Sequence, residues 1–116
     1  MRFLSPLPQQ ELRADFHQAR SLGQVRLGER FVHIRKFSGT RSLPYHQISR
    51  AWVRQEEVNA NLCCGRANFD QFYLMIQEKD GLPLWGQVPH KQAGLDCLDQ
   101  IRAKAPDVLI GPPGRP

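Results

Sequence analysis

The sequence lacks the features that mark membrane and secreted proteins. No apolar run approaches the roughly 20 residues that a membrane-spanning helix requires. The first eight residues hold one basic residue and two prolines, which interrupt the segment before a signal-peptide core develops. These absences predict a cytoplasmic protein without a transmembrane segment.

Cysteine is scarce, and its positions fit neither a disulfide framework nor a zinc site. Cys63, Cys64 and Cys97 are odd in number, and two of them are adjacent. Adjacent cysteines bridge only through a strained ring, and they lack the short gap that lets both thiolates face one tetrahedral metal. The sequence therefore predicts small, incidental thiols and no metal.

Local catalytic motifs are also missing. The histidines and cysteines occur outside any nucleophile elbow, paired-histidine helix or glycine-rich phosphate loop. In the segment Cys63-Cys64-Gly65-Arg66, Arg66 is placed to lower a thiol pKa, but a turn with incidental thiols accounts for the same residues. We therefore expect that the chain is not an enzyme and binds no cofactor.

Acidic residues are nearly absent between Arg26 and Arg54, where seven basic residues face Glu29 alone. The rest of the chain has a slight acidic excess, so this stretch accounts for the formal net charge of +5. If it forms adjacent strands, the charge becomes a surface that attracts phosphate, acidic peptide or lipid headgroups. The basic residues are Arg26, Arg30, Arg35, Lys36, Arg41, Arg50 and Arg54.

Hydrophobic periodicity predicts a helix near each end of a single domain. Each helix presents an apolar stripe at helical spacing. The first, residues 8–20, ends before Gly23, and the second, residues 91–105, ends at Pro106. The closing helix is expected to cover the apolar face of a sheet.

Between the helices the period changes to two, which is typical of strands. Alternation begins at Gln24, and hairpin turns are expected at residues 38–40 and 79–81. A strand is expected from Leu43 to Arg54, but it keeps no single register, so we expect a bend or bulge in it. Residues 59–68 are predicted to form a turn-rich connection or a short edge strand.

Four segments carry a family resemblance. They are Leu27-Gly28-Glu29-Arg30-Phe31, Leu43-Pro44-Tyr45-His46-Gln47-Ile48, Phe72-Tyr73-Leu74-Met75-Ile76 and the helical Cys97-Leu98-Asp99-Gln100-Ile101. In this order the chain resembles the pleckstrin-homology-like (PH-like) domains of small bacterial proteins. The resemblance covers roughly residues 22–111.

The resemblance implies an α+β fold. A PH-like bent antiparallel sheet or partly open barrel of about five to seven strands would be capped by the C-terminal helix. The expected organisation is an N-terminal helical extension at 1–22, the PH-like domain at 23–111 and a flexible tail at 112–116. Such domains bind phosphoinositides, phosphopeptides or proteins, but the phosphoinositide pattern has no matching spacing around Arg26 and Arg30.

The sequence therefore predicts a non-catalytic binding or scaffold module that acts through protein contacts or self-association. An anionic partner is expected at a basic strand face. Its candidate residues are Arg35, Lys36, Arg41, Arg50, Trp52 and Arg54.

The alternative is a nucleic-acid-binding protein that uses the basic and aromatic surface from Arg26 to Arg54. Trp52, Tyr45 and Trp85 would then stack on bases while arginines meet phosphates. The competing interpretation is that Trp52 caps the barrel and the arginines lie along its sides with solvated heads, which we favour. An equally simple explanation of the basic surface as a whole is that its charges only keep the protein soluble.

Overall fold

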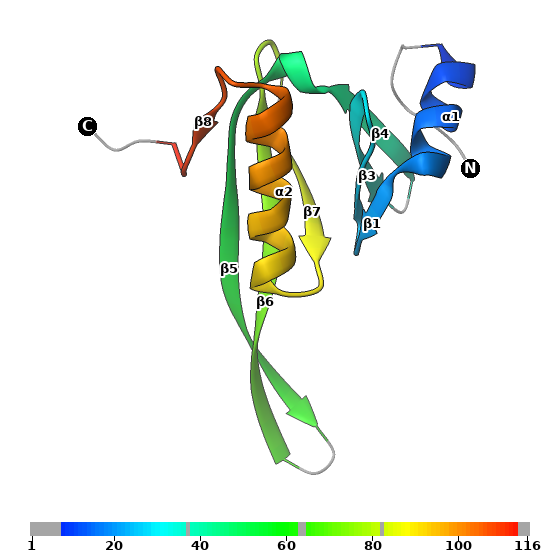
Figure 1. Cartoon of the computed structure of the whole chain (residues 1–116). Helices are drawn as coiled ribbons and strands as arrows, with labels where there is room; N and C mark the ends of the chain where they lie inside the picture. The colour runs from blue at the N-terminus through cyan, green and yellow to red at the C-terminus, as the bar shows by residue number, and fades with distance from the viewer. Residues whose placement is uncertain (1–7, 37, 63–64, 82, 114–116) are drawn as a thin grey trace.

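The computed structural model describes residues 8–36, 38–62, 65–81 and 83–113, which form two helices and eight strands (Figure 1). The chain order is α1 (Gln9–Gln18), β1 (Arg20–Leu22), β2 (Val25–Leu27), β3 (Phe31–Lys36), β4 (Gly39–Pro44), a 3₁₀ turn η1 (Tyr45–Gln47), β5 (Ile48–Leu62), β6 (Gly65–Glu78), β7 (Pro83–Val88), α2 (Lys91–Lys104) and β8 (Leu109–Ile110).

The first four strands form one sheet, sheet A, in the order β1-β2-β3-β4, with every neighbour antiparallel. Because side chains alternate along a strand, the two faces of sheet A differ. One face carries Val25, Val32 and Ile34 into the main core, while the other carries Phe31 and His33 toward α1.

The remaining strands form sheet B, in the order β7-β6-β5-β8. β5 and β6 make a long antiparallel hairpin, and β8 pairs with β5 in parallel. The inner face presents Ala51, Leu74 and Ile76, which are fully buried. The outer face presents the alternate residues, and no described element covers it.

The main core lies between the two sheets and α2. Helix α2 contributes Ala93, Cys97 and Ile101, all fully buried, and packs along β5, β6 and β7. β7 lies close against sheet A at Gly86, since a Cβ there would lie 3.0 Å from methyl groups of Ile34 and Val25. The sheets are therefore joined through β7.

Helix α1 covers the outer face of sheet A, on the side away from sheet B (Figure 1). Leu12 and Phe16 pack with Phe31 in a second, smaller apolar cluster. Although α1 precedes the sheet, β1 follows it directly and pairs with β2, so the N-terminal segment enters sheet A as well as covering it.

The predicted fold class is confirmed. The chain is an α+β protein of largely antiparallel sheets with a C-terminal helix and an additional N-terminal helix, and its arrangement is consistent with a PH-like fold. The sheets remain two open sheets instead of closing into a barrel, and the described strands number eight instead of five to seven. No helix within the described ranges has the length and apolarity to cross a bilayer.

Two expectations about the middle of the chain were wrong. Residues 59–68 are mostly strand, because β5 and β6 continue to Leu62 and from Gly65. The strand expected from Leu43 is interrupted by η1, which separates β4 from β5. The predicted bulge is confirmed, since the β5–β6 register shifts between Ile48 and Arg50.

Candidate functional site

Three of the candidate residues lie at the end of the β3–β4 hairpin. Lys36 follows Ile34 by two residues, and Arg41 lies directly opposite Ile34, so both extend from the face of sheet A that packs toward β7. Arg35 extends from the opposite face. Lys36 and Arg41 therefore come together, whereas Arg35 faces another way.

The other three candidates lie on β5. Trp52 and Arg54 share the outer face of sheet B, and Arg54 Nη2 lies 3.4 Å from Glu56 Oε2. Arg50 Nη1 donates to the carbonyl oxygens of Gly111 at 3.1 Å and Pro112 at 3.0 Å. Arg50 thus fastens the chain end beside β8, and Trp52 and Arg54 stay available on the sheet face.

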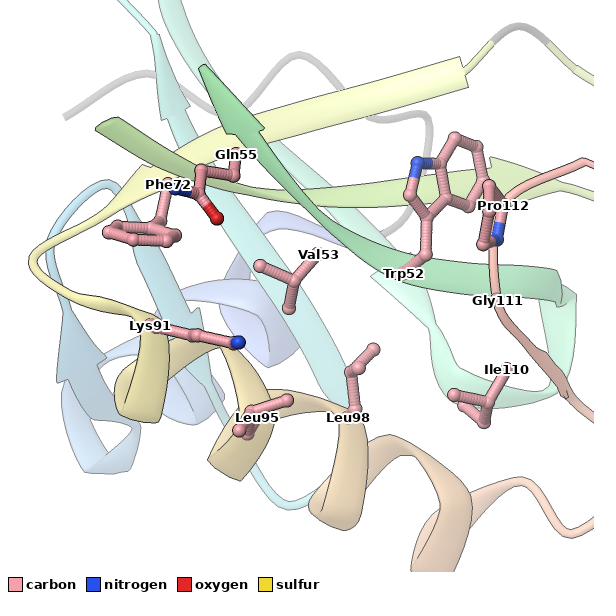
Figure 2. Close-up of a pocket in the computed structure, with 10 residues that line it drawn as sticks. All are labelled: Trp52, Val53, Gln55, Phe72, Lys91, Leu95, Leu98, Ile110, Gly111 and Pro112. Carbon is pink, nitrogen blue, oxygen red and sulfur yellow. The ribbon is translucent and has the colours of Figure 1, made fainter. Parts of the chain in front are cut away.

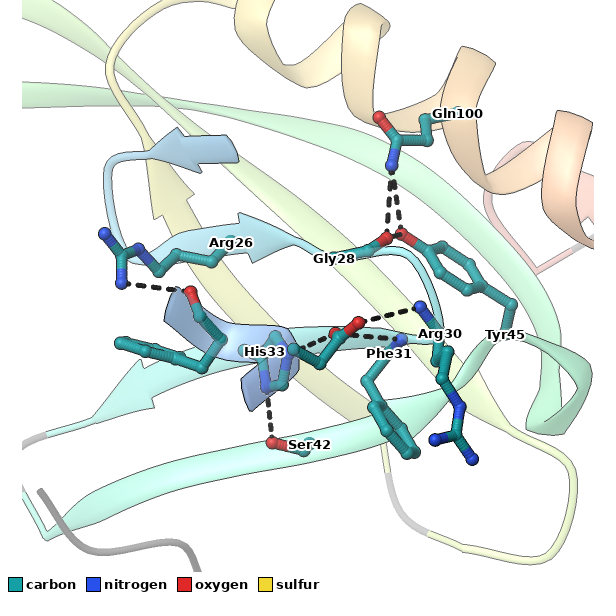
Figure 3. Close-up of polar contacts among 10 residues, drawn as sticks. Arg26, Gly28, Arg30, Phe31, His33, Ser42, Tyr45 and Gln100 are labelled. Atoms are coloured by element: carbon teal, nitrogen blue, oxygen red, sulfur yellow. Dashed lines mark hydrogen bonds and ion pairs between the residues drawn. The ribbon is translucent and has the colours of Figure 1, made fainter. Parts of the chain in front are cut away.

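The two remaining arginines of the basic stretch hold α1 (Figure 3). The Arg26 guanidinium lies 4.2 Å from the Phe16 ring centroid and donates to the Phe16 carbonyl oxygen at 3.3 Å. Arg30 lies 5.3 Å from the Phe31 ring centroid, and its Nη2 donates to Glu11 Oε2 at 3.4 Å. Their charges therefore serve the attachment of α1.

Trp85, on β7, is the most exposed aromatic residue among the described residues of sheet B. Its side chain is 48% exposed, and Lys36 Nζ lies 3.3 Å from its ring centroid. The Tyr73 ring meets Trp85 edge to face, at 5.7 Å between centroids. Lys36 Nζ is buried without a hydrogen-bond partner among the described residues, and this burial lowers the pKa of Lys36 below its ordinary value.

Trp85 separates two surface hollows. One, of about 440 Å³, lies on the Lys36 side and is lined by Lys36, Ser38, Arg41, Pro83, Leu84 and Trp85. The other, of about 260 Å³, lies over the outer face of sheet B and is lined by Arg54, Glu56, Tyr73, Met75 and Trp85. The first is basic, and the second combines two aromatic rings with a charge of each sign.

Tyr45 does not belong to this surface, which corrects the sequence interpretation. Its side chain is 5% exposed, and its hydroxyl donates to the Gly28 carbonyl oxygen at 2.7 Å (Figure 3). Gln100 Nε2 donates to the same hydroxyl at 3.2 Å. Burial raises the pKa of Tyr45 to about 12. Tyr45 ties the β2–β3 connection to α2.

An apolar groove runs between β5 and α2 (Figure 2). It has a volume of about 300 Å³, and Val53, Leu95 and Leu98 point into it. Leu95 remains 38% exposed although it is a large apolar side chain. Its other lining residues are Trp52, Gln55, Phe72, Lys91, Ile110, Gly111 and Pro112.

The edge of β5 opens beside this groove. β8 pairs only with Arg50 and Ala51, and the Gly111 amide donates to the Ala51 carbonyl oxygen at 2.9 Å. Backbone groups of alternate residues point to the same side of a strand, so the N–H and C=O of Val53 and Gln55 also point to this edge. No strand within the described ranges pairs with them there.

The chain itself ends this ladder after β8. Gly111 has a φ of 129°, in the region that favours glycine, and this turns the backbone out of strand geometry. Pro112 follows and has no amide hydrogen to donate to β5. The open edge beyond Ala51 is therefore a consequence of the Gly-Pro sequence.

A buried polar network joins α1 to sheet A (Figure 3). His33 Nε2 lies 2.7 Å from Asp15 Oδ2, and His33 Nδ1 lies 2.7 Å from Ser42 Oγ. The backbone amides of Arg30 and Phe31 donate to the Asp15 carboxylate at 3.0 and 3.3 Å. The consistent assignment is that His33 donates to Asp15 from Nε2–H and accepts from Ser42 at Nδ1.

Serine, histidine and aspartate also form the catalytic triads of hydrolases. Here the three side chains lie beneath α1, and Asp15, His33 and Ser42 are 7%, 0% and 6% exposed. Burial lowers the pKa of His33, outweighing the hydrogen bond and charge of Asp15, which raise it. Neutral His33 therefore links Asp15 of α1 to Ser42 of β4, and this structural role explains why the three side chains lie together.

The described residues contain no group of three or more potential metal ligands. Cys97 is fully buried, and burial raises the pKa of its thiol to about 12, so it is protonated at neutral pH. Cys63 and Cys64, considered in the sequence as thiols near Arg66, lie outside the described residues. Comparisons with family models, curated proteins and solved structures found no match to this chain.

Proposed function

We propose that the chain is a non-catalytic binding module that takes an extended segment of a protein partner along the open edge of β5. The observation that carries the proposal is the end of β8 after two residues, beside an apolar groove. Val53 and Gln55 present backbone donors and acceptors along this edge, and unpaired strand edges bind extended segments by adding a strand.

The lining of the groove determines which side chains a bound segment must carry. A strand added beside β5 would direct alternate residues toward α2, where Leu95 and Leu98 line the groove. We therefore expect apolar side chains at alternate positions of the segment. Lys91 also lines the groove and favours an acidic residue nearby.

The experiment screens an array of extended peptides with alternating apolar residues against the wild-type chain and a Leu95→Ser variant. Leu95→Ser should weaken binding by about tenfold, since it removes most of one apolar contact. Leu109→Ser is the matched control, because Leu109 is 56% exposed and does not line the groove. An equal loss of peptide affinity in both variants would contradict the placement of the peptide in the groove.

Backbone pairing has its own test. N-methylation of a bound peptide at alternate amides should abolish binding in one register and spare it in the other, because only one set of amides faces β5. Binding that survives methylation in both registers would overturn strand addition. Concentration-dependent dimerisation lost in Leu95→Ser would identify a second copy of this chain as the segment's source.

A further inference from the structure

The outer face of sheet B is the face turned away from α2, and it carries aromatic and charged side chains. Trp52 lies opposite Met75, which lies opposite Trp85, so these three form one row across three strands. Arg54 lies opposite Tyr73 in the next row. Strands lie about 4.8 Å apart, so the two indole positions are about 10 Å apart on one open surface.

Positive charge lies on both sides of Trp85. Lys36 and Arg41 approach it from sheet A, through the basic hollow of about 440 Å³. Arg54 approaches it from β5, through the hollow of about 260 Å³. Lys36 Nζ has no hydrogen-bond acceptor within the described part of the chain, and it lies 3.3 Å from the Trp85 ring centroid. This arrangement is complementary to an anion that also presents a flat, apolar surface.

The smaller hollow favours a planar group with polar edges. Tyr73 and Trp85 supply aromatic walls, and Met75 lines the same hollow. Glu56 also lines the hollow, and its carboxylate repels an acidic side chain but accepts hydrogen bonds from the amino group of a nucleobase. The pair Arg54 and Glu56 thus suits a base better than it suits an acidic peptide.

We propose that the outer face of sheet B binds single-stranded nucleic acid, with bases stacked at Trp85, Tyr73 and Trp52 and phosphates held at the exposed Arg41, beside the buried ammonium group of Lys36. Aromatic rings on a sheet face bind successive bases with little sequence preference, and nearby cations follow the backbone. Trp52 also lines the groove beside β5, so the experiments that separate the two proposals use Trp85 and Arg41, which do not line it.

The test measures binding of a fluorescently labelled deoxythymidine or uridine oligomer of about 12 nucleotides by anisotropy at low salt. Trp85→Ala should weaken binding about tenfold or more, and Trp85→Phe should retain most of it, because the phenyl ring still stacks. The groove variant Leu95→Ser should leave oligomer binding unchanged. Both tryptophans of the chain lie on this face, so their fluorescence should be quenched as the oligomer binds.

Charge is tested with a matched pair. Arg41→Gln should reduce the slope of log affinity against log salt by about 0.7, the value for one phosphate contact on a single strand. Arg102→Gln removes an exposed charge from α2, away from the sheet face, and should leave the slope unchanged.

Two results would overturn the proposal. The first is absence of oligomer binding at low salt by the folded wild-type chain. The second is binding that Trp85→Ala leaves intact or that polyglutamate reproduces with equal affinity, since this face would then respond to charge alone and suit an acidic protein. Loss of binding in Trp85→Ala, with folded protein and no binding of polyglutamate, supports it.

Discussion

Replacing Asp15 by alanine tests the connection between α1 and sheet A. The carboxylate accepts hydrogen bonds from His33 Nε2 and from the backbone amides of Arg30 and Phe31. Alanine removes the acceptor of the His33 Nε2–H and of the buried Phe31 amide, and each buried donor that loses its acceptor costs about 1–3 kcal/mol. We therefore expect Asp15→Ala to lower the free energy of unfolding by about 3 kcal/mol.

Asp15→Asn provides the matched comparison. Its amide NH₂ can donate to His33 Nε2 if the imidazole proton moves to Nδ1, and its carbonyl oxygen can still accept from a backbone amide. The expected loss is about 1 kcal/mol, since one acceptor is removed. Urea denaturation followed by both tryptophan fluorescence and circular dichroism measures the two variants. Equal stability of Asp15→Ala and wild type would refute the role given to this network.

Three further outcomes are expected. The free energy of unfolding should be constant above about pH 6.5 and fall below it, because the histidine takes up a proton in the unfolded chain but resists protonation when buried. In urea titrations at several pH values, His33→Gln should flatten this dependence on pH. Gly86→Val should cost about 2 kcal/mol by thermal unfolding, because the added methyl groups meet β2 and β3, whereas Gly81→Ala at the exposed β6–β7 turn should be nearly neutral. In a variant with serine at the two other cysteines, the buried Cys97 thiol should react with a thiol reagent only after denaturant is added.

Periodicity was sufficient to predict the helices and the alternating strands. Helix α2 was expected over residues 91–105 and extends over Lys91–Lys104, because Pro106 and a regular apolar stripe define it locally. Residues 59–68 were mispredicted because Gly65 and asparagines resemble a loop, whereas pairing between β5 and β6 extends both strands through them. Long-range pairing of this kind leaves no local signal.

The candidate surface was only partly predictable. Sequence alternation placed Trp52 and Arg54 together, and it also separated Tyr73 and Met75 from the buried residues of β6. The approach of Lys36 to Trp85 joins two sheets and depends on how they pack, so no spacing in the sequence reveals it. The same holds for the bond between Asp15 and His33, which joins residues on different elements.

The short ladder of β8 has a mechanical consequence for the groove. β8 follows α2 after the short connection 105–108, and it is held by two paired residues, by the bond from the Gly111 amide to Ala51 and by the bonds from Arg50. A pull on the chain's C-terminal end loads these few bonds before it reaches the helix. Ile110 and Gly111 line the groove, so detaching β8 would remove one wall of it and release the end of α2. The width of the groove is thereby coupled to tension on the C-terminal segment.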